Sequence, residues 1–260
     1  MTLLDDLIED LVAEGDQLEA ALDRVEWTAP TPAAGWTVAT TIAHLLWTDE
    51  VATLAARAHD DKPAWDAVVT TALADPAGFV DTEAYRIAAL EPGEVLARWA
   101  VARAELRTAL REVPSGAKMP WFGPPMSAAS MATARFMETW AHALDVHDAA
   151  GEHPAPTDRI RHVAHLGVRT RNFAFATRDE APPTEEFHVA LVAPSGKTWT
   201  WGPEDAAQSV RGSAYDFCRL VTQRVHRDDT DLVATGPDAE HWLEIAQAFA
   251  GPPGPGRAAS

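Results

Sequence analysis

The chain has 260 residues, of which 47% are hydrophobic and 23% charged, a composition typical of a soluble globular protein with one or two domains. Its formal net charge of −18 argues against nucleic-acid binding, because affinity for a polyanion comes from Lys and Arg. No apolar stretch is long enough to span a membrane, the N-terminus lacks the basic region of a secretory signal, and the single cysteine, Cys218, excludes an internal disulfide. We therefore expect a cytoplasmic protein.

Four segments of the N-terminal part carry apolar residues at the spacing of amphipathic helices. The spacing predicts helices over residues 3–25, 37–57, 93–113 and 128–149. Long helices joined by short connections pack antiparallel against one another. We therefore predict a helical bundle over residues 1–153.

A proline-rich segment, Pro-Trp-Phe-Gly-Pro-Pro-Met at residues 120–126, precedes the last of these helices. Proline fixes the backbone and lacks an N–H group, so the segment indicates an ordered loop rather than a helix or a central strand. Its large apolar side chains are suited to close over a small apolar molecule. We predict that Trp121, Phe122 and Met126 contact the bound cofactor or substrate.

The composition changes after the Pro-Ala-Pro segment at residues 154–156. Alternating apolar residues on the two sides of a Pro-Ser-Gly-Lys turn indicate a pair of strands, and the neighbouring segments have helical spacing. The predicted fold class is α+β: the bundle, a small α+β domain over residues 154–250 and a disordered tail over 251–260. In this domain we expect helices at 157–178, 215–221 and 239–250, and strands at 187–193, 198–201 and 231–235.

One face of the helix at 128–149 carries four ionisable residues, each three or four positions from the next. These residues are Arg135, Glu138, His142 and Asp145. Ionisable groups on such an apolar helix are costly to bury unless they are paired or bind a metal. Glu138 and His142, one turn apart, can both reach one ion. The alternative is a surface stripe in which Glu–His and Arg–Asp contacts stabilise the helix.

His44 lies in an apolar stretch of the helix at 37–57 that is expected to face the core. A core histidine usually hydrogen-bonds to a carbonyl or hydroxyl group. If His44 instead faces Glu138 and His142, two imidazoles and a carboxylate surround one point and leave one tetrahedral position open, as in a catalytic zinc site. We predict that these three residues bind a divalent metal, with zinc as the first candidate.

Two stretches of the chain resemble the mycothiol-dependent maleylpyruvate isomerase family of the DinB-like superfamily. They are Gly-Trp-Thr-Val at residues 35–38, leading into Ala-His-Leu at 43–45, and Glu-Thr-Trp-Ala-His-Ala-Leu-Asp at 138–145. The resemblance implies a DinB-like four-helix bundle in which His44, Glu138 and His142 bind zinc. It also implies that mycothiol or a similar thiol is a cosubstrate.

The resemblance extends to the C-terminal part, where Tyr-Asp-Phe at residues 215–217 with a following arginine is similar to the sterol-carrier-like domain of these enzymes. In the isomerases this domain contributes an arginine to the active site. Arg224 is the first candidate for that role, ahead of Arg219 and Arg211, and it would pair with a carboxylate of the substrate or cofactor. The alternative is that these arginines are ordinary surface residues.

Three further positions carry expectations. Asp145 is predicted to orient His142 from outside the ligand set, the alternative being a carboxylate on the helix surface. Asp49 and Glu50 are expected to begin a solvated face of the second helix. Cys218 is expected to be a small core residue rather than a nucleophile.

The leading functional hypothesis is thiol chemistry at zinc. A metal lowers the pKa of a bound thiol, and the resulting thiolate adds to an electrophilic double bond of a small-molecule substrate, giving isomerisation or S-transfer. One alternative is a metal-dependent hydrolase or lyase that activates water. Another is a non-catalytic carrier whose α+β domain holds an apolar ligand. We expect a monomer or a homodimer with no membrane or nucleic-acid partner.

Overall fold

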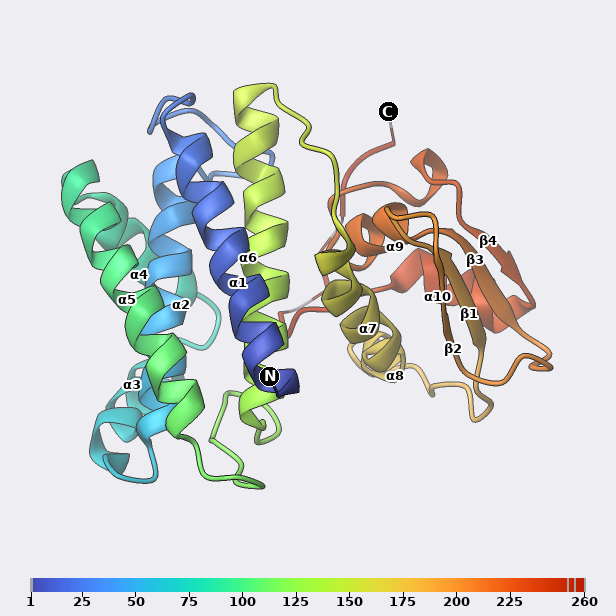
Figure 1. Ribbon diagram of the computed structural model, residues 1–260, viewed down its shortest axis with the longest axis horizontal. Helices are drawn as coiled ribbons and strands as arrows, with labels where there is room; N and C mark the ends of the chain where they lie inside the picture. Colours follow the sequence, from blue (N-terminus) through green and yellow to red (C-terminus); the bar gives the residue numbers. More distant parts are fainter. Residues whose placement is uncertain (1, 252, 255, 260) are drawn as a thin grey trace. The chain divides into compact units, whose positions relative to one another are not determined.

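The computed structural model describes residues 2–251, 253–254 and 256–259. The chain divides into two compact units, Met1–His153 and Pro154–Ser260, which are coloured blue to yellow-green and yellow to red in Figure 1. The predicted disordered tail includes residues 252, 255 and 260, which lie outside the described part, and its described residues belong to no helix or strand. None of the helices described is both long and apolar enough to cross a membrane.

The first unit contains the predicted four-helix bundle (Figure 1). In it α1 packs against α6, and α2 packs against both α5 and α6. Two shorter helices, α3 and α4, lie between α2 and α5 in sequence, and α2 also packs against α4. The bounds are α1 Leu3–Leu22, α2 Val38–Arg57, α3 Lys62–Ala74, α4 Phe79–Ala88, α5 Pro92–Glu112 and α6 Ala128–Ala150.

Capping residues set the ends of the bundle helices. Thr2 and Thr37 form capping boxes at the starts of α1 and α2, and the Ser127 side chain accepts a hydrogen bond from the backbone N–H of Ser130 at the start of α6. Gly151, with φ of +69°, ends α6 in the left-handed conformation that glycine adopts at little cost. These local signals place the start of α2 and the end of α6, the two helices that carry the candidate ligands.

Helices α3 and α4 were not predicted from the sequence. The Asp-Asp-Lys-Pro segment at residues 60–63 follows α2 and also starts α3, because Asp61 caps α3 and proline lies in its first turn. Aspartate followed by proline is as much a start signal as a stop signal. Helix α4 is short and buries only Ala84 and Ile87, so its periodic signal is weak.

Among the described residues, the bundle core includes two groups of buried apolar residues, and Trp47 packs against both. The first group joins the first half of α1 to the second half of α2 and the start of α6. The second group joins the first half of α2 to the first half of α5 and the second half of α6. Members of the first group include Ile8, Trp65, Leu106 and Met131; members of the second include Ile42, Leu46, Trp99 and Val146.

A sheet with strand order β2-β1-β3-β4 forms the centre of the second unit (Figure 1). Strands β1 and β2 form the predicted antiparallel hairpin, while β1 and β3 run parallel and β3 and β4 run antiparallel. Strand β3 was not predicted, because its sequence Ser-Val-Arg-Gly-Ser has no apolar alternation. The bounds are β1 His188–Val192, β2 Thr198–Trp201, β3 Ser209–Ser213 and β4 Val233–Thr235.

The helices of the second unit complete the predicted α+β class. Rings of Phe187 and Phe217 pack on Trp242 of α10, with centroids 5.9 and 5.7 Å apart. Two predicted bounds were wrong: the helix expected over 157–178 is interrupted at Thr170, and the last helix ends at Ile245 because Ala246 is extended. The bounds are η1 Asp158–Ile160, α7 Arg161–Arg169, α8 Arg171–Ala176, α9 Ala214–Val221, η2 Arg227–Asp229 and α10 Pro237–Ile245.

Candidate metal centre

The structure brings together the three side chains that were predicted to bind a metal. One ligand atom each from His44, Glu138 and His142 lies within 4.8 Å of the other two. Glu138 Oε2 is 3.6 Å from His44 Nε2 and 3.5 Å from His142 Nε2. Zinc bonds of 2.0–2.2 Å at tetrahedral angles place ligand atoms about 3.4 Å apart. The donor set and its spacing therefore fit a tetrahedral divalent metal.

The antiparallel packing of α2 and α6 produces this set. His44, in the first half of α2, faces Glu138 and His142, in the middle part of α6. Asp49, about one and a half turns further along α2, contacts Arg135, about one turn earlier in α6. Residue numbers thus rise along one helix as they fall along the other. Glu138 and His142 share a face because they are four residues apart.

The protonation states of the set suit a cation. Burial lowers the pKa of His44 to about 4, and the nearby charges of His142 and Arg135 act in the same direction. Burial alone would raise the pKa of Glu138, but the contacts with His142 and His44 outweigh it and hold that pKa well below its usual range. At neutral pH the set therefore offers a neutral imidazole at His44 and a carboxylate at Glu138, the forms that bind metals.

Asp145 lies where it can orient His142. Its Oδ2 atom is 3.3 Å from His142 Nδ1, and the residue is 1% exposed, so the alternative of a carboxylate on the helix surface is wrong. A carboxylate that accepts the Nδ1–H leaves the Nε2 lone pair facing Glu138, as in carboxylate–histidine–metal arrangements. The Nδ1 atom of His44 is buried without a hydrogen-bond partner among the described residues.

Trp36 is an aromatic neighbour of both His44 and His142. From the sequence it was named only as part of the Gly-Trp-Thr-Val stretch. Its ring stacks on His142, with centroids 5.7 Å apart and planes at 11°, and lies tilted against His44 at 5.2 Å. The backbone N–H of Trp36 donates to Ala33 O, and the N–H of Thr31 donates to Trp36 O. This turn precedes α2 directly and holds the indole against the ligand set.

The expectation of a solvated face at Asp49 and Glu50 was wrong for Asp49. Asp49 is 3% exposed and accepts hydrogen bonds from Arg135 Nε at 2.9 Å and Trp99 Nε1 at 3.2 Å. Glu50 is partly exposed and binds Arg98 through both carboxylate oxygens. Helix α2 packs against α4, α5 and α6, so few of its positions face water.

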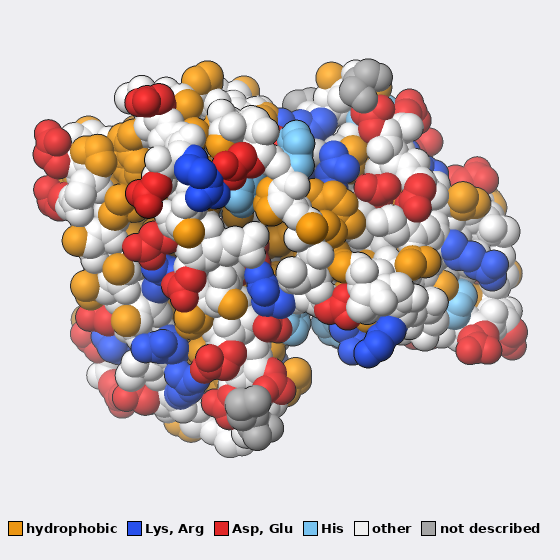
Figure 2. Space-filling view, turned by 45° about the horizontal axis from the view of Figure 1, so that its top comes forward, with side chains coloured by type: hydrophobic (Ala, Val, Ile, Leu, Met, Phe, Trp, Pro, Cys, Tyr) orange, Lys and Arg blue, Asp and Glu red, His pale blue; other side chains and the backbone are white. Residues whose placement is uncertain are grey.

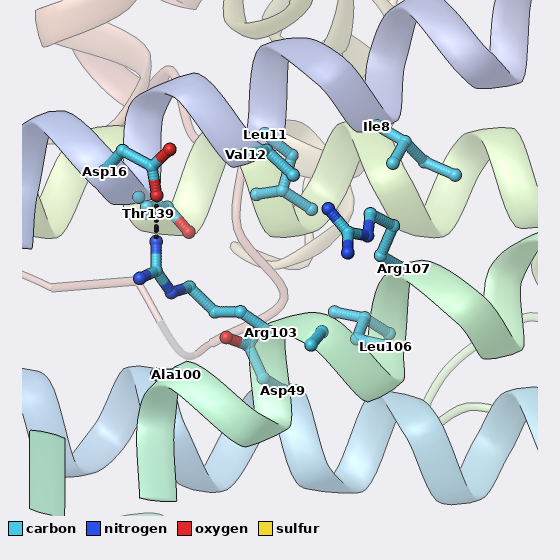
Figure 3. A pocket seen from close by; sticks show the side chains of 12 residues that line it. Ile8, Leu11, Val12, Asp16, Asp49, Ala100, Arg103, Leu106, Arg107 and Thr139 are labelled. Atoms are coloured by element: carbon cyan, nitrogen blue, oxygen red, sulfur yellow. Dashed lines mark hydrogen bonds and ion pairs between the residues drawn. The ribbon is translucent and has the colours of Figure 1, made fainter. Parts of the chain in front are cut away.

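A cavity of about 130 Å³ lies between α1 and α5 (Figure 3). Asp49, Arg103 and Thr139 contribute to its lining, together with apolar residues of α1 and α5. The figure shows Arg103 extended across it to Asp16, with a hydrogen bond of 3.0 Å. No candidate metal ligand lines this cavity, so it is separate from the metal centre.

Trp121, Phe122 and Met126 lie in an ordered loop, as expected. Met126 pairs with Met119 through two backbone hydrogen bonds. The ring centroid of Trp65 lies 6.1 Å from that of Trp121 and 5.4 Å from that of Phe122. The loop directly precedes α6, whereas the ligand glutamate lies ten residues into that helix, about 15 Å along its axis. The predicted cofactor-binding role of the loop stays a prediction.

The candidate arginines belong to the second unit. Arg224 Nη1 donates to the backbone oxygen of Thr222, Arg219 lies 3.5 Å from Asp216, and Arg211 is an exposed residue of β3. Their predicted roles in the site stay predictions. Cys218 is fully buried, as expected, and its Sγ donates to Ile160 O.

The surface agrees with the negative net charge. On the face shown in Figure 2, Asp and Glu side chains are spread over both units, with Lys and Arg interspersed among them.

Two family models match the chain. The first, described as the mycothiol maleylpyruvate isomerase N-terminal domain, matches residues 8–147, a segment that contains all three candidate ligands and Asp145. The second, described as wyosine base formation, matches residues 183–235, which include the strands β1 to β4. The sterol-carrier-like character predicted for the second unit stays a prediction.

Similar whole chains are also known. Two uncharacterized proteins of Mycobacterium tuberculosis, from strains CDC 1551 / Oshkosh and ATCC 25618 / H37Rv, are each 55% identical over 253 residues, covering 96% of this chain and 97% of the relative. The crystal structures of a mycothiol-dependent maleylpyruvate isomerase and of its mutant each match with a TM-score of 0.60 at 16% identity, over 92% of this chain and 98% of theirs. At that identity the structural match shows the fold.

Proposed function

We propose that this chain, which belongs to the mycothiol maleylpyruvate isomerase N-terminal domain family, a family of enzymes, is an enzyme that uses a low-molecular-weight thiol at a divalent metal. The thiol is mycothiol or a similar one, and zinc is the first candidate for the metal. The substrate of the enzyme is a small electrophilic molecule that it isomerises or to which it transfers sulfur. The observation that supports this proposal is the spacing of 3.5 and 3.6 Å around the Glu138 carboxylate.

Each residue of the centre has a role in this proposal. His44 and His142 supply neutral nitrogen donors, Glu138 supplies a negative charge, and Asp145 fixes the tautomer of His142. These residues would hold a divalent metal, which would supply a Lewis acid able to lower the pKa of a bound thiol. Trp36 covers the two imidazoles on one side, which limits access of water to them.

Two parts of the proposal concern the substrate. Arg224 pairs with a carboxylate of the substrate or the thiol, and Trp121, Phe122 and Met126 contact the cofactor. In isomerisation the thiol sulfur bonds to one carbon of an activated double bond and is expelled after rotation, so the thiol is recovered. In S-transfer the thioether leaves as product and one thiol is consumed for each turnover. We place the enzyme in the cytoplasm, where such thiols remain reduced.

Metal content tests the centre. We expect the purified chain to hold about one equivalent of divalent metal, as a single site of this type predicts, and the His142→Ala variant to hold almost none. A matched control is His153→Ala, because His153 is a largely exposed histidine of the same unit. Equal metal content in the wild type and the His142→Ala variant, both folded by circular dichroism, would contradict the assignment.

Thiol dependence separates the proposed reaction from its alternatives. Substrates with activated double bonds should turn over only when a low-molecular-weight thiol is added. A hydrolase or lyase that activates water needs no thiol, and a carrier binds its ligand equally well after metal chelation. Product formation without thiol would therefore replace the proposed reaction with metal-activated water. Measuring thiol consumption per product then distinguishes isomerisation from S-transfer.

A further inference from the structure

The ion pair between Asp49 and Arg135 is buried beside the metal centre. The two side chains are 5% and 3% exposed, and Arg135 Nε donates to Asp49 Oδ1 at 2.9 Å. The Nη2 atom of Arg135 is also buried and has no hydrogen-bond partner among the described residues. Replacing a buried ion pair with two apolar side chains of similar volume is often neutral or stabilising, and a buried donor without a partner adds a further cost to the pair. Stability alone therefore does not explain the pair.

The pair ties together the helices that carry the ligands. Asp49 lies five residues after His44 on α2, and Arg135 lies three residues before Glu138 on α6, which are about 7.5 and 4.5 Å along the two axes. The Asp49 carboxylate also accepts a hydrogen bond from Trp99 of α5. One carboxylate thus joins three helices next to the ligand set.

Large apolar residues of both helices, among them Ile42, Leu46 and Val146, contribute to the register of α2 against α6. Both helices are also rich in alanine, and small side chains give shallow ridges and holes that specify axial position weakly. A buried polar pair fixes register because any slip leaves its charges unpaired. A slip along the axis would move His44 away from Glu138 and His142, which belong to the other helix.

We propose that Asp49 and Arg135 are positioning residues: they fix the register of α2 against α6 and so hold His44 at metal-binding distance from Glu138 and His142. This inference rests on the proposed metal site, and it adds a role for residues that touch neither metal nor substrate. The geometry of the ligand set, rather than the stability of the bundle, is what the pair provides.

The test replaces the pair without leaving a buried charge. The double variant Asp49→Leu/Arg135→Met removes both charges at similar volume, a change that commonly preserves stability. The matched control is Glu50→Gln/Arg98→Gln, which removes the adjacent, partly exposed pair between α2 and α5. For each protein we would measure the melting temperature, the Kd for Co²⁺ and the visible absorption of bound Co²⁺, which reports on coordination geometry.

We expect the apolar double variant to melt close to the wild-type temperature but to bind Co²⁺ at least about 10-fold more weakly, as for other outer-shell partners, with an altered visible spectrum. The control variant Glu50→Gln/Arg98→Gln should leave the Co²⁺ affinity and the visible spectrum unchanged. Wild-type affinity and spectrum in the folded double variant would overturn the inference and leave the metal site intact. A wild-type chain that binds no Co²⁺ would instead overturn the proposed function.

A second variant decides the matter if the apolar pair does not fold. Arg135→Lys keeps a positive charge for Asp49 but cannot reproduce the fixed geometry of the guanidinium. Weaker Co²⁺ binding by about 10-fold in this folded variant would support a positioning role. Unchanged affinity and spectrum would overturn the part of the inference that assigns the register to the fixed geometry of the guanidinium.

Discussion

At the scale of single residues, the imidazole of His142 is constrained from two directions. Asp145 lies at its Nδ1 edge and the Trp36 indole stacks on its face. Together they leave Nε2 directed toward Glu138, so the ring reaches the ligand position without searching other rotamers. Such pre-organisation raises metal affinity because less conformational entropy is lost on binding.

Replacement of Asp145 by asparagine tests this constraint. Asp145→Asn keeps the shape of the side chain but removes its charge, and we expect the metal affinity to fall by about 10- to 100-fold. Competition with a chelator of known affinity measures the change. Asp148→Asn is the matched control, because Asp148 is an exposed carboxylate on the same helix. Equal affinities of the two variants would contradict the role of Asp145.

Cys218 provides a second prediction at this scale. Burial raises the pKa of its thiol well above the usual range, and thiolate is the reactive form. We expect no reaction with a thiol reagent such as iodoacetamide at pH 8 in the folded protein, and full reaction after denaturation. Rapid labelling under native conditions would show that the packing around α9 opens readily.

At the scale of elements, close backbone approach decides which turns tolerate a side chain. Gly202 follows β2 with φ of +75°, and a Cβ there would lie 2.1 Å from Phe187 O. Gly196, in the turn between β1 and β2, has φ of +81° but open space around a Cβ. Both positions favour glycine for its backbone, and only Gly202 also requires it for space.

The two glycines form a matched pair of substitutions. Gly196→Ala should cost only the strain of a left-handed residue, about 1–2 kcal/mol. Gly202→Ala should cost about 1–3 kcal/mol more, because the chain after β2 must move away from the Phe187 backbone that precedes β1. Urea denaturation of the two variants measures the difference. Similar losses would show that the segment around Phe187 moves aside at no cost.

His241 gives a pH-dependent contact between α10 and the segment after α8. Its Nε2 lies 2.6 Å from Glu180 and its Nδ1 3.2 Å from Glu244, and these hydrogen bonds raise its pKa. Because the pKa of His241 is higher in the folded than in the unfolded protein, its contacts stabilise the fold fully below the unfolded-state pKa of about 6.5. This contribution is lost as the pH rises through the folded-state pKa. His241→Gln should therefore reduce stability at pH 6 and change little at pH 9, as measured by thermal melting.

At the scale of the whole molecule, metal binding is coupled to the stability of the bundle. The ligands come from two helices far apart in sequence, so the unfolded chain holds no comparable site. Free metal at 100 times its Kd should stabilise the wild type by about 2.7 kcal/mol, measured by denaturation with metal and with a chelator. The His142→Ala variant should show no such difference, and an equal shift in both proteins would contradict the coupling.

Local patterns in the sequence were sufficient for much of the fold. The spacing of apolar residues predicted the four bundle helices, and alternation around a turn predicted β1 and β2, because these signals depend on neighbouring residues. The pairing of Glu138 with His142 follows from helical geometry. That His44 faces them was a hypothesis from its place in an apolar helix, and the resemblance to a known family strengthened it. Helix α4 and strand β3 lacked a periodic signal and were missed.

Only the tertiary structure decided which polar residues are buried and what they contact. Asp49 has the sequence neighbours of a surface residue, yet α5 and α6 enclose it and supply Trp99 and Arg135 as partners. The stacking of Trp36 on His142 likewise joins segments about one hundred residues apart. Helix periodicity is a property of one segment. Burial and hydrogen-bond partners depend on several segments packed together, and the order of residues in the chain does not specify which segments meet.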